Sequence, residues 1–197
     1  MIGHVPDSGA DETHRAIAAA SSAFKSWSKS DLGFRVGLLH RLHDAILDQQ
    51  EALAGLLTAE QGKPLAESAG EIMYGASFIE WFAEEGKRIY GDVIPTHMSD
   101  RRIIVIKQSV GVVACITPWN FPNAMITRKA GPALAAGCTI VIKPASETPL
   151  SALALAELAE QAGIPAGVFN IITTTNSRAT GKELTESPLV RKFSFTG

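Results

Sequence analysis

Two short apolar segments, each followed by a polar loop, constrain the fold of this chain more than any other feature. The first spans residues 112–116 and the second 139–142, and a helical pattern at 124–136 lies between them. Short runs rich in β-branched residues and bounded by turn residues are typical of buried strands. Strand, helix and strand in this order predict a right-handed βαβ unit with two parallel strands.

The same alternation continues towards residue 195. Helical patterns at 150–162 and 177–187 alternate with apolar segments at 168–172 and 192–195. Short connections between alternating elements predict an α/β fold with a Rossmann-like parallel sheet and flanking helices. We expect Thr148 to cap the helix that begins at Pro149, and Gly163 to end it.

The first part of the chain is predicted to be helical. Apolar residues recur every three to four positions at 11–29, at 31–61 and from Pro64 to about residue 89. Asp31 is the expected cap of the second helix, and Gly62 is its expected end.

Turn residues and a change in composition follow these helices. Residues 91–95 and 99–100 are expected to form turns, and the β-branched segment 101–113 is expected to form a strand. The change in composition divides the chain into an N-terminal helical part, residues 1–110, and a parallel α/β part, residues 111–197.

The composition gives no reason to expect nucleic acid or a membrane as a partner. The 18 Lys and Arg residues against 20 Asp and Glu give a net charge of −2, which favours neither nucleic acid nor an anionic membrane as a partner. The N-terminus lacks the features of a signal peptide, and no apolar stretch approaches the roughly 20 residues that span a bilayer. We expect a cytoplasmic protein that binds a small molecule or another subunit.

The cysteines and histidines are expected to be structural. Cys115 and Cys138 lie in or beside predicted buried strands, and a chain without a secretory signal is not expected to form a disulfide. His40 and His43 lie three positions apart on a predicted helix. Because no cysteine or carboxylate cluster accompanies them, we expect a solvated or packed face and no metal site.

Four motifs resemble a known enzyme superfamily. TPWNFP (117–122) and IKPASETP (142–149) resemble the aldehyde dehydrogenases. MITRKAGPALAAGCT (125–139) and SALALAELAEQAGIPAGVFN (151–170) are similar, more narrowly, to the succinate-semialdehyde dehydrogenases. The resemblance implies part of a cofactor-binding domain, and NAD(P)-dependent oxidation of succinate semialdehyde or a similar semialdehyde acid to the carboxylate.

Asn120 is the catalytic residue that this resemblance indicates. When a thiol adds to an aldehyde, the carbonyl oxygen becomes an oxyanion, and a side-chain amide stabilises it without donating a proton. The resemblance gives this role to Asn120, and gives Trp119 and Phe121 the role of shaping the pocket. An Asn that only satisfies the loop backbone is the alternative.

Lys143 and Ser146 are expected to bind the adenosine ribose of the cofactor. In the superfamily the position of Ser146 is often a glutamate that accepts from both ribose hydroxyls. A carboxylate there would repel a 2′-phosphate, whereas Ser146 and Lys143 offer it a hydroxyl and a cation. This difference favours NADP over NAD, unless the neighbouring Glu147 turns towards the site.

Arg128 is the expected substrate-binding residue beside Phe121. It lies eight residues beyond Asn120, which is about two helical turns on nearly the same face. A planar guanidinium suits a carboxylate, and the resemblance implies that Arg128 holds the far end of a semialdehyde acid. A surface salt bridge with a helical neighbour is the alternative.

Further cofactor contacts are expected at the ends of the predicted strands. Residues 193–197 resemble the start of a glycine-rich turn that lets the backbone approach a pyrophosphate. The remaining expected cofactor-binding residues are Ile116, Thr117, Pro118, Trp119, Gly181, Phe195, Thr196 and Gly197.

The superfamily has further catalytic residues beyond these motifs. Its nucleophilic cysteine and general-base glutamate lie further along, and neither Cys115 nor Cys138 matches the nucleophile. We therefore expect an N-terminal fragment that is inactive alone and self-associates or is marginally stable, while the full-length enzyme is a homo-oligomer. A non-catalytic module that binds nucleotide or another subunit is the alternative.

Overall fold

The computed structural model describes residues 2–197. Within these residues the helices are α1 (Ala10–Trp27), α2 (Leu32–Asp48), α3 (Gln50–Gln61), α4 (Leu65–Gly86), α5 (Ala124–Ala135), α6 (Pro149–Gln161) and α7 (Ser177–Glu186). The strands are β1 (Asp92–Ile94), β2 (Ile103–Val105), β3 (Val112–Ile116), β4 (Thr139–Lys143), β5 (Phe169–Ile171) and β6 (Val190–Phe195).

Four parallel strands form the central sheet in the order β5-β4-β3-β6. The chain moves outward from β3 through β4 to β5, and then returns to place β6 on the other side of β3. The expected α/β fold with a parallel sheet and flanking helices is confirmed.

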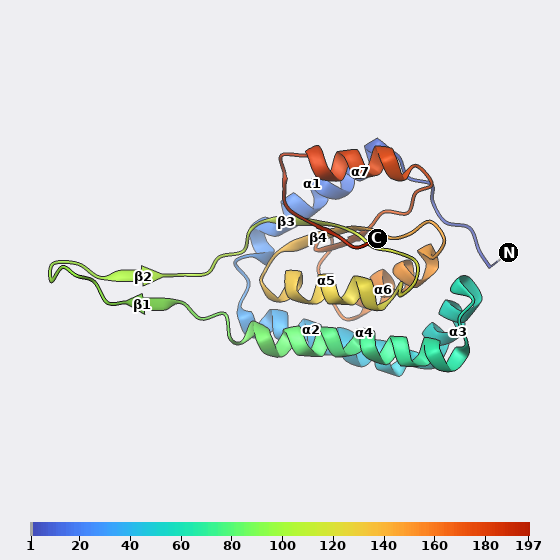
Figure 1. The fold of residues 1–197 in the computed structure, drawn as a ribbon, viewed down its shortest axis with the longest axis horizontal. Coiled ribbons are helices and arrows are strands. Elements are labelled where there is room, and N and C mark those ends of the chain that lie inside the picture. Colours follow the sequence, from blue (N-terminus) through green and yellow to red (C-terminus); the bar gives the residue numbers. More distant parts are fainter. Residues whose placement is uncertain (1) are drawn as a thin grey trace.

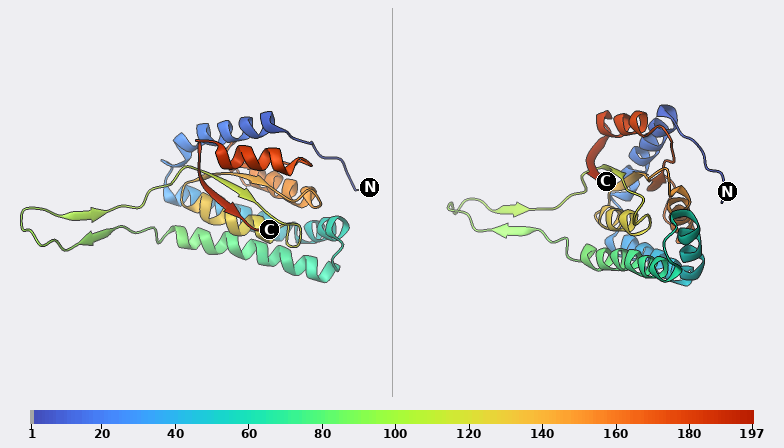
Figure 2. Two further views of the ribbon diagram at one scale, coloured as in Figure 1. Left: turned by 45° about the horizontal axis from the view of Figure 1, so that its top comes forward. Right: turned by 45° about the vertical axis from the view of Figure 1, so that its right-hand side comes forward.

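The helices cover both faces of the sheet (Figure 1). Helices α1 and α7 lie on one face, and α5 and α6 lie on the other. Helices α2 and α4 pack outside α5, which is therefore covered by the sheet on one side and by helices on the other; Figure 2 shows these layers from two further directions.

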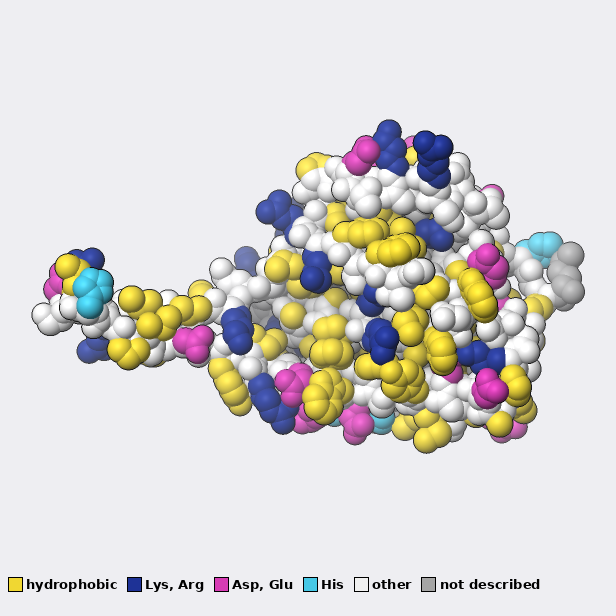
Figure 3. All heavy atoms as spheres, in the orientation of Figure 1, with side chains coloured by type: hydrophobic (Ala, Val, Ile, Leu, Met, Phe, Trp, Pro, Cys, Tyr) yellow, Lys and Arg dark blue, Asp and Glu magenta, His cyan; other side chains and the backbone are white. Residues whose placement is uncertain are grey.

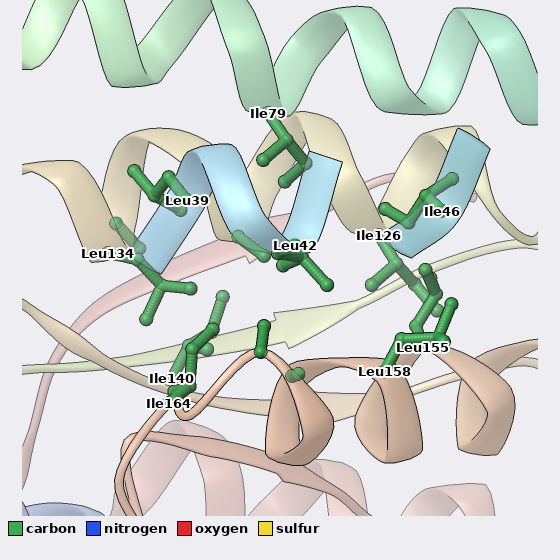
Figure 4. Close-up of a cluster of buried hydrophobic side chains, with 14 of the residues drawn as sticks. Leu39, Leu42, Ile46, Ile79, Ile126, Leu134, Ile140, Leu155, Leu158 and Ile164 are labelled. Atoms are coloured by element: carbon green, nitrogen blue, oxygen red, sulfur yellow. The ribbon is translucent and has the colours of Figure 1, made fainter. Parts of the chain in front are cut away.

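One hydrophobic core joins the N-terminal helices to the sheet. Figure 4 shows side chains from α2, α4, α5, α6 and β4 converging on it. The labelled residues are Leu39, Leu42, Ile46, Ile79, Ile126, Leu134, Ile140, Leu155, Leu158 and Ile164. Residues 1–110 and 111–197 therefore share buried apolar surface, which is the main favourable term in folding.

The expected single helix over 31–61 is wrong, because the chain bends at Gln49. This residue has φ −101° and ψ 14° and separates α2 from α3. The bend lets α3 pack against both α4 and α6. Apolar spacing continues across the bend, so periodicity did not predict it, whereas Gly62 ends α3 with φ 90° as expected.

Asp31 and Thr148 occupy the expected N-cap positions of α2 and α6, but neither makes the capping hydrogen bond expected of its side chain. Glu60 of α3 replaces Thr148: its carboxylate accepts hydrogen bonds from the main-chain N–H groups of Leu150 and Ser151. A carboxylate from another helix satisfies the free amides and complements the helix dipole.

A long hairpin replaces the turn expected at 91–95 and most of the strand expected at 101–113, whereas the turn expected at 99–100 is confirmed. Residues 92–94, expected to be a turn, form β1, and only Ile103–Val105 of the expected strand forms β2. The two pair antiparallel and project away from the body (Figure 1). Apolar side chains gather along the projection (Figure 3), including Val93 and Ile104, which are 76% and 67% exposed.

The two cysteines are buried, as expected, and the two histidines of α2 contact carboxylates. Cys115 and Cys138 are buried free thiols. His40 contacts Glu84 and His43 contacts Asp44, and no cluster within residues 2–197 has the composition of a metal site. No helix in the range is both long and apolar enough to span a membrane.

Candidate active site

The carboxyl ends of three neighbouring strands bring the predicted site residues to one edge of the sheet. Ile116, the last residue of β3, is paired with Lys143 of β4 on one side and with Phe195 of β6 on the other. The next residue, Thr117, donates its N–H to the Lys143 carbonyl at 3.1 Å. Because the strand order reverses between β3 and β6, this edge is a topological switch point, where open α/β sheets bind ligands.

Asn120 lies on the loop that follows β3. Its side chain is exposed, and within residues 2–197 its hydrogen bonding involves the main-chain oxygen, which accepts from Lys63 Nζ at 2.9 Å. Within residues 2–197 the side-chain amide of Asn120 makes no hydrogen bond to the loop backbone, which was its alternative role. Trp119 and Phe121 flank it and are 54% and 41% exposed.

Lys63 and Glu71 support this loop, and neither was a predicted site residue. They form a salt bridge, with the side chain of Lys63 9% exposed and that of Glu71 1% exposed. Glu71 Oε1 accepts from the N–H groups of Asn123 at 2.9 Å and Ala124 at 3.3 Å, at the start of α5. The sequence did contain a signal for Glu71. This residue lies four positions before Gly75 and eight before Ile79, so the helical period places its carboxylate on the buried face of α4.

Lys143 and Ser146 lie in different environments. Lys143 is 4% exposed and donates from Nζ to the Pro144 carbonyl at 2.8 Å. Burial lowers the pKa of Lys143 below its ordinary value, and the nearby Glu147 carboxylate opposes this effect. Ser146 is exposed and donates its hydroxyl to Glu147 at 3.1 Å, so a carboxylate does lie beside Ser146.

Arg128 is held by aromatic side chains of α4. It donates to the Tyr74 hydroxyl at 2.9 Å, and its guanidinium carbon lies 4.7 Å from the Phe78 ring centroid. The expected alternative was a surface salt bridge, but none of the ion pairs within residues 2–197 involves Arg128. Its charge therefore has no carboxylate partner in this range.

The other expected cofactor residues lie around the same edge. Thr196 donates its N–H to the Ile116 carbonyl at 3.1 Å, which brings residues 195–197 next to β3. Gly181 lies on α7, and a Cβ placed on it would come within 3.9 Å of Ile116 Cδ1. The Thr117 hydroxyl is buried without a hydrogen-bond partner in residues 2–197.

This set of donors fits a phosphorylated nucleotide. The edge offers a buried ammonium, an exposed hydroxyl and an unpartnered hydroxyl, at Lys143, Ser146 and Thr117. Phosphate oxygens accept hydrogen bonds from such groups.

Comparison with known proteins assigns the family. The model of the aldehyde dehydrogenase family matches residues 1–197. The chain belongs to the aldehyde dehydrogenase family.

Its relatives include enzymes named for semialdehyde acids. The chain is 64% identical over 196 residues to the succinate-semialdehyde dehydrogenase (NADP+) GabD of Escherichia coli K12. It is 62% identical over 197 residues to a glutarate-semialdehyde dehydrogenase of Pseudomonas aeruginosa. These matches include 100% of this chain and 40% and 41% of the two relatives.

A solved structure agrees with both the family and the fold. A crystal structure described as an E. coli NADP dependent enzyme superposes with a TM-score of 0.97 at 64% identity, over 99% of this chain and 40% of that one. The expected resemblance to the aldehyde dehydrogenases is confirmed. The chain spans about 40% of the length of the relatives that it matches.

Cys115 of this aldehyde dehydrogenase chain lacks the properties of a nucleophile. Cys115 is fully buried in β3, and burial raises the pKa of its thiol from 9.0 to about 12, although Lys129 and Lys192 oppose the shift. A thiol that keeps its proton is a poor nucleophile. This agrees with the expectation that Cys115 is a core residue.

The raised pKa of Cys115 predicts slow alkylation in the folded protein. At pH 8, iodoacetamide should modify Cys115 at least about a hundredfold more slowly in the folded protein than in the unfolded chain, because burial both shields the thiol from the reagent and raises its pKa. Mass spectrometry of the peptide that contains Cys115 measures both rates. Rapid modification of the folded protein would contradict the assignment.

The same shift predicts a loss of stability at alkaline pH. Between about pH 9 and 12 the unfolded thiol releases its proton while the folded one retains it, so unfolding becomes more favourable as the pH rises. In urea titrations a Cys115→Ala variant should lose stability less steeply over this window than the parent. Equal slopes would contradict the prediction.

Proposed function

We propose that this chain serves an enzyme that oxidises a semialdehyde acid, such as succinate semialdehyde, to the corresponding carboxylate with NADP, and that the nucleophilic cysteine and the general base of that enzyme are not among the residues of this chain. The observation that best supports this activity is the position of Asn120 at the carboxyl end of β3. Its side-chain amide is exposed while its main chain is held by Lys63. An amide presented in this way is suited to donate to a substrate oxygen.

Asn120 stabilises the negative charge that develops on the aldehyde oxygen. Its side-chain N–H donates a hydrogen bond to that oxygen. This hydrogen bond becomes stronger as the charge grows, so it accelerates the reaction rather than only tightening substrate binding. A bound nicotinamide cofactor supplies the hydride acceptor. The cofactor-binding residues of this chain would hold the nucleotide at the carboxyl ends of the strands.

Arg128 binds the carboxylate at the far end of the substrate. Its guanidinium is oriented by Tyr74 and Phe78 and has no carboxylate partner in residues 2–197. The relatives named above are named for succinate and glutarate semialdehydes, whose aldehyde and carboxylate are separated by short chains. An oriented but unpaired cation supports a substrate that carries an anion.

Lys143 and Ser146 favour NADP over NAD. Lys143 offers a cation and Ser146 a hydroxyl donor to a 2′-phosphate. The E. coli relative is named for NADP. The Ser146 hydroxyl donates to the Glu147 carboxylate in this structure. To bind NADP, this hydroxyl must break that hydrogen bond and donate to the 2′-phosphate instead.

The β1-β2 hairpin is proposed to contact another subunit in a homo-oligomer. Val93 and Ile104 are directly opposite each other in the register of the two strands and are largely exposed, as is Ile106 at 68%. Contiguous apolar surface of this kind is uncommon on monomeric proteins and marks interaction sites. The two-stranded sheet also has open edges that another chain can cover.

Replacement of Asn120 tests the proposed activity. The assay uses a chimera in which residues 1–197 replace the matching 40% of the E. coli enzyme. Oxidation of succinate semialdehyde with NADP is expected, and Asn120→Asp should lower kcat by about 10²–10³, because a carboxylate cannot donate to the oxyanion. The matched control is Gln161→Glu, an amide-to-acid change on the exposed end of α6. A chimera without activity, or an Asn120→Asp variant within threefold of its parent, would contradict the proposal.

Replacement of Ser146 tests the cofactor preference. Ser146→Glu should lower kcat/KM for NADP by about ten- to a hundredfold relative to NAD, because the new carboxylate repels the 2′-phosphate and removes a contact worth roughly 1.5–3 kcal/mol. Ser146→Gln has similar bulk without charge and should have a smaller effect. The choice of NADP would be wrong if the parent chimera preferred NAD and Ser146→Glu left the ratio unchanged.

A charge on the hairpin tests the proposed subunit contact. Ile104→Lys should shift the chimera to a smaller species in analytical ultracentrifugation, because a buried lysine in an interface is costly, while the exposed side chain contributes little to the fold. The control is Leu65→Lys, which changes an exposed apolar residue outside the hairpin, at the start of α4. Equal sedimentation of both variants and the parent would exclude the hairpin from the interface.

A further inference from the structure

The proposed function gives no part in the reaction to the buried ion pair of Lys63 and Glu71. A buried ion pair gains little net stability over apolar residues of similar volume, because both charges lose their hydration. Its presence beside the Asn120 loop therefore calls for another explanation. The hydrogen bonds that the pair makes supply one.

The pair binds the Asn120 loop, residues 117–123, at its middle and at its junction with α5. Lys63 Nζ bonds to Glu71 and to the Asn120 carbonyl, and lies 4.3 Å from the centroid of the Phe121 ring. Glu71 Oε2 accepts from Lys63, while Oε1 accepts from the main-chain N–H groups at the start of α5. Lys63 thus holds Glu71 and the middle of the loop, and Glu71 holds Lys63 and the end of the loop that leads into α5.

Packing also restricts the loop on the α4 side. A Cβ placed on Gly75 would come within 2.0 Å of Asn123 Oδ1, so α4 and the loop are already in close contact. Asn123 is 1% exposed. The loop therefore cannot shift towards α4, and the ion pair opposes movement away from it.

We propose that Lys63 and Glu71 are positioning residues that orient Asn120 towards the substrate oxygen. This inference rests on the proposed role of Asn120. The ammonium holds the Asn120 carbonyl and the carboxylate holds the following amides, which fixes the main chain from which the Asn120 side chain projects. Such positioning acts on the transition state, because small displacements of a catalytic group change rate more than binding.

A double-mutant cycle separates positioning from general stability. In the chimera, Lys63→Met removes the cation at similar length and should lower kcat by about 10- to 100-fold, with KM changed less than about threefold. In an Asn120→Ala background the same change should alter kcat less than about threefold, because residues that act through one group are not additive. An equal loss in both backgrounds would show that Lys63 does not act through Asn120.

Lys87→Met is the matched control for this cycle. Lys87 also pairs with a glutamate of α4, Glu84, but at an exposed position remote from the loop. Its kcat should remain within twofold of the parent. A loss equal to that of Lys63→Met would attribute the effect to α4 in general and overturn the proposal.

Hydrogen exchange tests the contact without any activity assay. In the 197-residue chain, Glu71→Ala should speed exchange in the peptide that contains Asn123 and Ala124 by more than about tenfold, and leave a peptide from α6 unchanged. Glu71→Gln keeps an acceptor oxygen and should restore part of the protection. Unchanged exchange at 123–124, or equal acceleration in both peptides, would overturn the proposal.

These two measurements also separate this inference from the proposed function. An inactive chimera would overturn the proposed function and with it the role of the pair in orienting Asn120. The exchange result would still show whether Lys63 and Glu71 hold the loop. An active chimera with a fully additive cycle would leave the proposed function intact and reject the positioning role.

Discussion

The burial of α5 on two opposite sides is the constraint on which the rest of the structure depends. The sheet covers one side of this helix, and α2 and α4 cover the other. A helix in this position needs small residues where it meets its neighbours, and α5 has Ala130 and Gly131 there. A Cβ on Gly131 would lie 3.1 Å from the Phe78 carbonyl of α4, so the two helices approach closely.

This close approach connects the N-terminal helices to the chemistry at the sheet edge. Because α4 lies against α5, Glu71 reaches the free amides at the start of α5, and Tyr74 and Phe78 reach Arg128. The loop after β3 is therefore held from outside the sheet, by groups that precede it by about fifty residues in the sequence. The helical part of the chain contributes to the site as well as to the core.

The sequence was sufficient for features that depend on local pattern. Alternating apolar strands and helices predicted the parallel sheet, and motifs of many residues predicted the family, because both signals lie within short continuous segments. Gly62 and Gly163, with φ of 90° and 88°, end their helices as expected, because left-handed conformations favour glycine.

Features that depend on contacts between distant segments could not be predicted in this way. Glu60 rather than Thr148 caps α6, and Lys63 holds Asn120, because folding brings together residues far apart in the chain. The bend at Gln49 likewise depends on α4 and α6, against which α3 packs. The roles of Asn120, Lys143, Ser146 and Arg128 remain predictions, although the structure describes their surroundings.

The pairing of β3 with β6 has a consequence for the order in which the protein folds during synthesis. β3 lies inside the sheet, but its neighbour β6 begins only at Val190, so one edge of β3 has no partner when β4 and β5 leave the ribosome. Synthesis of residues 172–189, which separate β5 from β6, takes roughly 1–4 seconds at about 5–20 residues per second. During that interval the nascent chain exposes an unpaired apolar strand, the kind of surface that chaperones bind and that favours misassembly.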